Sequence, residues 1–462
     1  MSSSARWALG LGPLVATMLW LALWWAGLPA PQCWTAAITS LCAVWWITEP
    51  IPIPATSMIP FALLPFAGVL SHRDLATAYG HTLILLFLGG FLLSAAMERS
   101  GAHRRLAVAM VRTLGRGGGR RLVLGFMIAT AVLSMWISNT ATALMMLPIA
   151  VAVIRSADER DAASLAPPLL LGIAYGASIG GLGTPVGTPP NVVFLSVYAE
   201  HTGREIDFLG WMKIGVPVTV VMLPIAWLWI TRRLRGIGHL SMPAPGAWTK
   251  AEVRVAIVFV ITAMAWMTRR YWSSRLGLEE VGDSTVALLA AVGLFLIPDG
   301  DDGRLLDWPA AQRIPWGLLL LFGGGIAIAK AFTVSGLSET LGEFMRVLAT
   351  WPTLAMVLCI CLAVTFLTEI TSNTATTTML MPILAAAALA AGIEPAALMV
   401  PAALSASCAF MLPVATPPNA VIMGAGYLTI RHMTREGLVL NLVGALVISL
   451  LCLLLVGQGA FR

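Results

Sequence analysis

Charged residues are scarce in this chain of 462 amino acids. Asp, Glu, Lys and Arg make up 11% of it, and 58% of the residues are hydrophobic. Soluble domains contain roughly a quarter charged residues, so this composition argues against a single water-soluble fold. Apolar runs continue as far as Leu455, which indicates a chain that stays in the bilayer and not a signal peptide ahead of a soluble domain.

Motifs for metal, nucleophilic or nucleic-acid chemistry are also missing. None of the six cysteines stands in a Cys-x-x-Cys pair, no histidines have metal-ligand spacing, and neither His-Glu-x-x-His nor Gly-x-Ser-x-Gly occurs. These absences argue against disulfides, zinc and a membrane-embedded enzyme. Only three residues are lysine, and the arginines lie at the ends of apolar runs. This is typical of a membrane protein whose partner is lipid, and we expect no nucleic-acid binding.

What the sequence has is a series of long apolar segments without alternating polarity. Inside a bilayer only helices and closed barrels satisfy their backbone groups, and runs of this kind predict helices. We therefore expect an all-α polytopic membrane protein. The eleven predicted crossings are residues 8–28, 33–48, 53–70, 81–98, 170–198, 212–231, 252–268, 284–298, 315–332, 396–425 and 436–457.

Two further apolar segments, residues 122–154 and 354–391, are each interrupted by Ser-Asn-Thr. A polar triplet in mid-segment is a poor fit to a simple crossing, so we interpret each as a re-entrant hairpin, with protein or a water-filled cavity around its tip. With a cytoplasmic N-terminus, this arrangement places most Lys and Arg residues in the cytoplasm, as the positive-inside rule requires. Arg269 and Arg270 are exceptions.

The chain also contains an internal repeat. Each repeat has five predicted crossings and one hairpin, and because five is odd, the second copy is expected to lie upside down relative to the first. Inverted repeats with broken helices are typical of secondary transporters, whose site lies near the midplane. The matching landmarks are Phe87-Leu-Gly-Gly and Phe322-Gly-Gly-Gly, Ser100-Gly and Ser335-Gly, Ser138-Asn-Thr-Ala and Ser372-Asn-Thr-Ala, and Thr188-Pro-Pro-Asn and Thr416-Pro-Pro-Asn.

The Ser-Asn-Thr and Thr-Pro-Pro-Asn motifs suit the binding of ions. Tandem prolines cannot continue a helix and free the carbonyls before them. Helix N-termini offer N–H donors to a carboxylate, whereas freed carbonyls and Asn or Ser oxygens suit a sodium ion. The four motifs therefore predict two cation sites and one anion site. They contain no Lys or Arg, so we expect bound cations to neutralise a dianionic substrate, which would make the transport depend on sodium.

These paired motifs, together with Trp45-Trp-Ile-Thr-Glu-Pro-Ile-Pro-Ile-Pro near the start, resemble the divalent anion/sodium symporter family over nearly the whole chain. The resemblance implies a homodimer in the bacterial inner membrane, with a scaffold and an elevator-type transport domain in each protomer. It places the scaffold in residues 1–121 and 250–350. Residues 122–249 and 351–462 would form the two halves of the transport domain.

The resemblance also implies site residues. The first sodium site would comprise Ser134, Ser138, Asn139 and the Gly187 carbonyl, and the second Thr368, Ser372, Asn373 and the Ala415 carbonyl. The substrate carboxylates would meet Asn139, Thr140, Thr188, Pro189, Asn373, Thr374, Thr416 and Pro417. Gly187 and Ala415 differ between the repeats, but each can offer only its carbonyl.

The predicted function is sodium-coupled symport of small di- or tricarboxylates such as succinate. A sodium-independent dicarboxylate exchanger and a sodium/sulfate symporter of the same fold are the alternatives. The hydroxyls of Ser134 and Thr368 favour the symporter, and the paired midplane breaks favour a carrier over a channel. The sequence leaves open the preferred anion. It also leaves open the role of Glu369, an acid at membrane depth that could line the cavity or pair within the fold.

Overall fold

The computed structural model describes residues 3–115, 117–234, 246–345 and 351–457. Its regular structure is helical, and one isolated bridge joins Pro298 to Arg304. The first part of the chain forms α1 (Ser3–Trp25), α2 (Ala30–Thr48), α3 (Ile53–Thr56), α4 (Ile59–Phe66), α5 (His72–Tyr79), α6 (Thr82–Ser100), α7 (Ala102–Leu114), α8 (Gly119–Ser134), α9 (Asn139–Arg155), α10 (Glu159–Gly181), the 3₁₀ turn η1 (Pro185–Gly187), α11 (Pro189–Thr202) and α12 (Phe208–Thr231). The second part forms α13 (Lys250–Leu276), α14 (Asp283–Leu296), α15 (Trp308–Ala311), α16 (Trp316–Ser335), α17 (Leu337–Met345), α18 (Thr353–Thr368), α19 (Asn373–Ala390), α20 (Ala396–Ala406), α21 (Pro417–Met423) and α22 (Ile430–Gly457).

Seven helices in the described part of the chain are long and apolar enough to cross a membrane. Several predicted crossings are instead built from shorter pieces. Residues 53–70 form α3 and α4, since prolines interrupt this stretch. Residues 396–425 form α20 and α21, and residues 170–198 span α10, η1 and α11. An all-helical polytopic membrane protein is confirmed, and the breaks within residues 170–198 and 396–425 end at the predicted Thr-Pro-Pro motifs.

Four helices lie outside the predicted crossings and hairpins, namely α5, α7, α15 and α17. The longest of them is α7, formed by residues 102–114. Its apolar side chains, among them the buried Val108 and Val111, recur at helical spacing, but its arginines lower the mean hydropathy. A search for long apolar segments therefore passes over it, because an amphipathic surface helix has a periodic pattern and not a continuous apolar run.

The two segments with Ser-Asn-Thr each form a helix, a turn and a second helix. The turn Met135–Ser138 joins α8 to α9, and Glu369–Ser372 joins α18 to α19. Ser138 is the N-cap of α9. Its Oγ accepts a hydrogen bond from the backbone N–H of Ala141 at 3.2 Å. The expected helix–turn–helix of each segment is thus present.

Equivalent helices follow one another in the same order in the two repeats. α6, α8–α9, α10, α11 and α12 correspond to α16, α18–α19, α20, α21 and α22. The matched residues Phe87 and Phe322 are both buried and pack edge to face, with ring centroids 5.2 Å apart. The duplicated landmarks therefore lie on duplicated structure, and α6 and α16 meet at one pair of them.

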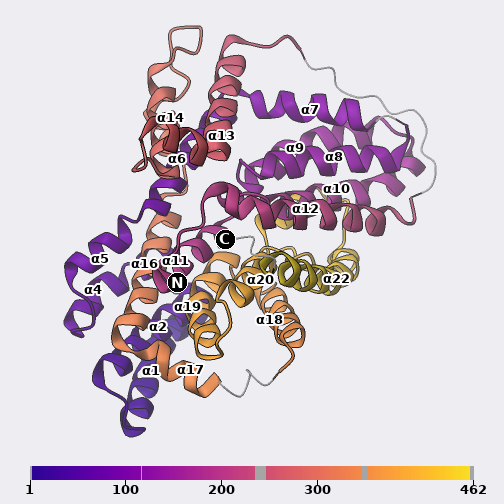
Figure 1. Cartoon of the computed structure of the whole chain (residues 1–462). Coiled ribbons are helices and arrows are strands. Elements are labelled where there is room, and N and C mark those ends of the chain that lie inside the picture. Colours follow the sequence, from indigo (N-terminus) through magenta and orange to yellow (C-terminus); the bar gives the residue numbers. More distant parts are fainter. Residues whose placement is uncertain (1–2, 116, 235–245, 346–350, 458–462) are drawn as a thin grey trace.

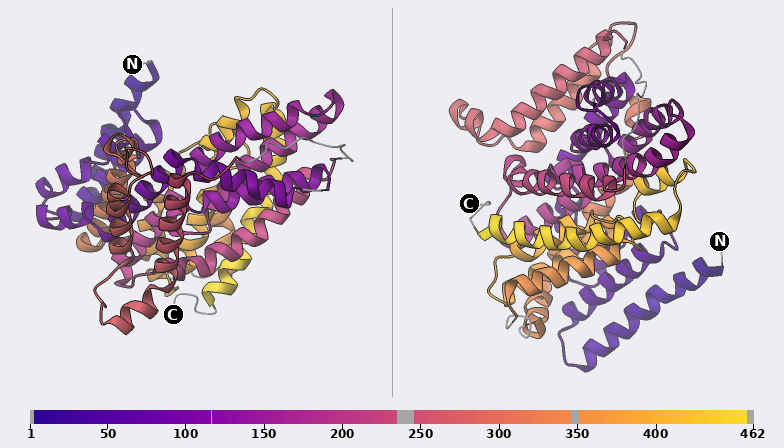
Figure 2. Two further views of the ribbon diagram at one scale, coloured as in Figure 1. Left: turned by 90° about the horizontal axis from the view of Figure 1, so that it is seen from above. Right: turned by 90° about the vertical axis from the view of Figure 1, so that its right-hand side faces the viewer.

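The helices of the two repeats interlock. α9 packs against α21 of the other repeat, α19 packs against α11, and α12 packs against α22. Arg232 and Glu436 strengthen the last pair with two hydrogen bonds of 2.6 and 2.9 Å, and the Glu436 side chain is buried. Figure 1 shows α8, α10, α12, α20 and α22 together on one side, with α4, α5 and α16 on the other, and Figure 2 gives two further views.

Candidate functional site

The break in the first repeat is held by Asn191. α10 ends at Gly181, and α11 begins at Pro189 because the tandem prolines suit only the first turn of a helix. The buried amide of Asn191 reaches back and donates hydrogen bonds to the carbonyls of Gly181 at 3.0 Å and Thr184 at 2.7 Å. Asn191 thereby satisfies two carbonyls that the missing helical turn leaves without partners.

The break in the second repeat uses the same device. The amide of Asn419 donates to the carbonyls of Ala409 and Leu412, each at 3.0 Å, and these acceptors lie ten and seven residues earlier, as for Asn191. Neither asparagine was among the predicted site residues. The duplicated final residue of Thr-Pro-Pro-Asn was the available signal, and the structure gives it a bracing role.

The first hairpin brings Ser134 and Asn139 together. Asn139 places one atom of its amide 2.5 Å from Ser134 Oγ and 3.3 Å from the carbonyl oxygens of Gly187 and Ala177. The NH₂ fits this position, because it can donate to the two carbonyls. With the amide turned over, Oδ1 joins these three oxygens, and four oxygens with a single hydroxyl proton among them would surround a cation. These residues therefore fit a sodium ion.

The second hairpin repeats the contact. Thr368 Oγ1 lies 2.6 Å from Asn373 Oδ1 and 2.9 Å from the carbonyl oxygen of Ala406. One hydroxyl proton again faces two acceptors, so this cluster is also rich in unneutralised oxygen. Both predicted sodium sites thus contain the expected hydroxyl–asparagine pair. Their assignment as sodium sites stays a prediction.

The other predicted residues lie around these pairs. Ser138 caps α9 and is exposed, and Ser372 stands at the equivalent position before α19. The buried Thr188 places its Oγ1 3.4 Å from Ser407 Oγ of the other repeat, and Thr416 Oγ1 accepts from Asn419 N at 3.4 Å. Each of these residues is at or next to a helix N-terminus. The remaining ones are Thr140, Pro189, Thr374 and Pro417, on the first turns of α9, α11, α19 and α21.

The first site has no room for a side chain at residue 187. A Cβ there would lie 2.5 Å from the carbonyl oxygen of Gly181, which is backbone and cannot rotate away. We predict that Gly187→Ala displaces its own carbonyl and raises the sodium concentration for half-maximal uptake about tenfold or more, because one cation ligand moves. Ala415→Gly, the opposite change in the second repeat, is the matched control and should alter this value less than threefold. Equal values for Gly187→Ala and the parent protein would contradict the prediction.

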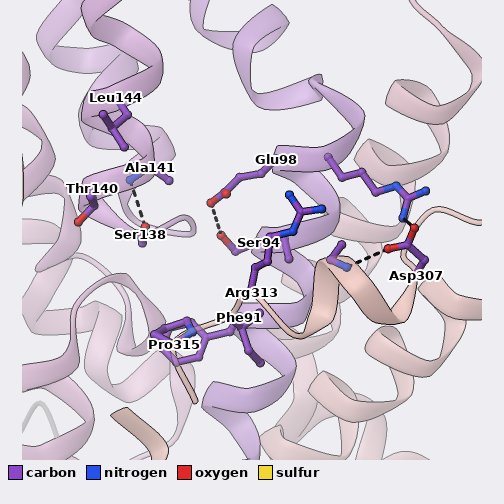
Figure 3. A pocket seen from close by; sticks show the side chains of 14 residues that line it. Phe91, Ser94, Glu98, Ser138, Thr140, Ala141, Leu144, Asp307, Arg313 and Pro315 are labelled. Carbon is purple, nitrogen blue, oxygen red and sulfur yellow. Dashed lines mark hydrogen bonds and ion pairs between the residues drawn. The ribbon is translucent and has the colours of Figure 1, made fainter. Parts of the chain in front are cut away.

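A cavity of about 700 Å³ opens beside the first hairpin tip. Figure 3 shows Ser138, Thr140 and Leu144 on one side of it, facing Phe91, Glu98 and Arg313. Of the predicted site residues, only Ser138 and Thr140 line it.

The lining of this cavity includes the charged residues Glu98, Arg99, Asp307 and Arg313. Asp307 forms an ion pair with Arg99, and the hydrogen bond from Ala310 N, together with the Arg99 guanidinium, holds the pKa of Asp307 below its ordinary value. The carboxylate therefore stays ionised. The cavity thus has charged groups and hairpin residues in one lining, which suits a small polar solute.

Comparison with known proteins agrees with this picture. The family described as "Sodium:sulfate symporter transmembrane region" matches residues 4–457. A Staphylococcus saprophyticus relative, named sodium-dependent dicarboxylate transporter SdcS, is 42% identical over 471 residues, covering 96% of this chain and 90% of the relative. A Staphylococcus aureus protein of the same name is 40% identical over 465 residues. The match covers 95% of this chain and 89% of the Staphylococcus aureus protein.

Two solved structures share the fold at 14% identity. The Alcanivorax borkumensis YdaH transporter has a TM-score of 0.60, and the match covers 93% of this chain and 99% of YdaH. Neisseria gonorrhoeae MtrF, described among antimetabolite efflux pumps, also has a TM-score of 0.60, and the match covers 92% of this chain and 95% of MtrF. The match to the family extends over nearly every helix, including both hairpins and both breaks. The chain therefore belongs to the sodium:sulfate symporter family, the divalent anion/sodium symporters, and is a multi-pass membrane transporter.

Proposed function

We propose that this protein is a secondary active transporter that carries small di- or tricarboxylates such as succinate, in symport with sodium, across the bacterial cytoplasmic membrane. The observation that carries the proposal is the pair of oxygen clusters at the hairpin tips, each with a hydroxyl 2.5 or 2.6 Å from an asparagine. The sodium-dependent dicarboxylate transporters that are 40–42% identical to the chain support the same ion and substrate class.

In this proposal, sodium ions occupy the two clusters and the substrate lies between them. The first ion is held by Ser134, Ser138, Asn139 and the Gly187 carbonyl, and the second by Thr368, Ser372, Asn373 and the Ala415 carbonyl. The helix N-termini beside Asn139, Thr140, Thr188, Pro189, Asn373, Thr374, Thr416 and Pro417 offer N–H groups and a positive dipole end to the substrate carboxylates. The interlocking of α9 with α21 and of α19 with α11 supports a shared site, because it brings these N-termini from both repeats into one body.

The finer architecture we propose is eleven crossings and two re-entrant hairpins in inverted repeats. The two short helices that follow α6 and α16 support the inversion. α7 contains His103, Arg104, Arg105 and Arg112, whereas the corresponding α17 contains Glu339 and Glu343. Basic residues favour the cytoplasmic side. A basic α7 and an acidic α17 therefore fit opposite faces of the membrane.

The proposed domains follow from the same packing. Residues 122–249 and 351–462 form the moving transport domain, and residues 1–121 and 250–350 form the scaffold that holds a homodimer. The bond between Arg232 and Glu436 supports one rigid transport body, since it joins the last helices of both repeats. An elevator movement would then slide this body, with its ions and substrate, past the scaffold.

A cross-link between the two domains tests the movement. Leu144 on the hairpin and Phe91 on α6 line the same cavity (Figure 3), so cysteines at both positions can be joined by a flexible bifunctional thiol reagent. The exposed Cys359 would first be replaced by alanine. We predict that cross-linking stops succinate uptake and leaves dimers on size-exclusion chromatography intact. Each single cysteine with the same reagent is the control, and undiminished uptake in fully cross-linked protein would contradict a moving domain.

Uptake into proteoliposomes tests the function itself. Succinate, citrate and sulfate would be compared with and without a sodium gradient, and counterflow of labelled succinate would separate a carrier from a channel. Sodium-driven uptake of a dicarboxylate is the expected result. Dicarboxylate counterflow that ignores sodium would favour the exchanger, and preferential sulfate uptake would favour the sodium/sulfate symporter.

A further inference from the structure

Glu369 is a buried acid whose contacts lead to the break in the second repeat. It stands at the C-cap of α18, directly after Thr368, and its residue is 3% exposed. Its oxygens accept three hydrogen bonds, from Met411 N and Leu412 N at 2.9 Å each and from Asn441 Nδ2 at 2.7 Å. Both carboxylate oxygens therefore have hydrogen-bond donors. No ion pair neutralises Glu369 within the described ranges of the chain.

These contacts connect Glu369 to the predicted sodium ligands. Leu412 donates its N–H to Glu369. The carbonyl of Leu412 in turn accepts hydrogen bonds from Ala415 N at 3.2 Å and from Asn419 Nδ2 at 3.0 Å. The position of the Ala415 carbonyl thus depends on a short chain of bonds that begins at Glu369. On the other side, Thr368 precedes Glu369 directly and contacts Asn373. Glu369 therefore links both halves of the second sodium site.

The first repeat lacks this arrangement. The residue equivalent to Glu369 in the Ser-Asn-Thr alignment is Met135, an uncharged residue. There the break is tied to the hairpin turn through the hydroxyl of Thr184, which donates to the carbonyl of Met135. The two breaks are thus braced by equivalent asparagines but tied to their hairpins differently, and of these two ties only that of the second repeat contains a carboxyl group. A buried negative charge attracts a nearby cation strongly, because little water screens it.

We propose that Glu369 is the positioning residue of the second sodium site and that its charge makes the two sites unequal. It fixes the break that carries the Ala415 carbonyl and supplies the negative charge that the first site lacks. The second site consequently takes sodium at a lower concentration than the first and is filled first. This inference rests on the proposed sodium-coupled function.

Sodium titration of the purified protein by calorimetry tests the inequality. The parent protein should show two components of different affinity. Glu369→Gln, which removes the charge and turns one acceptor into a donor, should weaken the tighter component about tenfold or more, as expected when a hydrogen-bonded charge is lost. Succinate affinity at saturating sodium should change little, whereas a purely structural role would lower it.

Three variants separate this idea from the alternatives. Glu369→Asp keeps the charge but shortens the reach, so its tighter component should lie between those of the parent and Glu369→Gln. Asn441→Leu removes one donor and leaves the charge, and should weaken the same component about threefold. Thr184→Val removes the uncharged hydrogen bond that connects the break to the hairpin in the first repeat. It is the matched control and should weaken only the lower-affinity component of sodium binding.

The outcomes are distinguishable. A parent-like titration of Glu369→Gln would overturn the inference and leave the proposed function standing. So would an equal loss of both components in Glu369→Gln. A parent protein that binds no sodium would overturn the proposed function, and the inference with it.

Discussion

Alanine at Asn139 or at Asn373 is expected to abolish sodium-driven succinate uptake and to leave the protein folded in the membrane. The side-chain amide of each asparagine lies within 2.6 Å of a hydroxyl at a hairpin tip. Alanine removes the amide and with it one oxygen ligand, and a cation that loses its hydration water needs every ligand the protein offers. A single missing ligand costs a few kcal/mol, which corresponds to a loss of uptake of about 100-fold or more.

The measurement is uptake of labelled succinate under a sodium gradient, normalised to the amount of inserted protein. Thr142→Val is the matched control, because Thr142 lies on the same helix as Asn139, is buried, and its hydroxyl has no hydrogen-bond partner in the described structure. It should retain uptake close to that of the parent. Uptake with unaltered sodium dependence in either alanine variant would remove that residue from the sodium site.

The second large effect concerns charge. Helix N-termini contribute about 0.3–1 kcal/mol each when exposed and up to about 2 in partly buried geometry, and neutral hydrogen bonds contribute about 1 kcal/mol each. These amounts fall short of what a dicarboxylate loses on leaving water. Bound sodium must supply the remainder. We therefore expect succinate affinity to fall on the order of 100-fold when choline replaces sodium at constant ionic strength, and, by reciprocity, succinate to tighten sodium binding by the same factor.

Two hydroxyl variants refine this test. Thr374→Val and Thr416→Val should weaken succinate binding more than sodium binding, because their hydroxyls are predicted to meet the carboxylates. Both residues are buried beside a helix N-terminus, and valine keeps their shape. Calorimetry with succinate and with sodium measures both affinities. Equal succinate affinity in sodium and in choline would show that the coupling argument is wrong and would favour the exchanger.

Much of the fold could be read from the sequence because its strongest signals are local. Apolar runs predict helices, Ser-Asn-Thr predicts a turn, and tandem prolines predict a break, and each of these depends on neighbouring residues alone. α7 was missed for the opposite reason, since arginines dilute its hydropathy. The split of residues 53–70 into α3 and α4 was also missed, although its prolines gave a signal.

The candidate site was predictable only in part. The duplicated motifs indicated Asn139 and Asn373, and the structure brings each to its expected hydroxyl partner. Two bracing devices were not foreseen, the amides of Asn191 and Asn419 and the clamp of Glu369 with Asn441. Asn441 lies 72 residues after Glu369, and contacts over such a separation leave no local pattern. Which helix of one repeat packs against which helix of the other is equally invisible in the sequence.

The interlocking of the repeats has a consequence for how the molecule is made. α9 is synthesised early, but its partner in the second repeat, α21, leaves the ribosome only after the whole of α10 to α20. Until then the first hairpin packs only against earlier helices such as α10, and its polar tip lacks the contact with the second repeat. Assembly of the ion-binding centre is thus among the last events of biogenesis, and an N-terminal fragment that ends before α21 would insert but hold an open, incomplete centre.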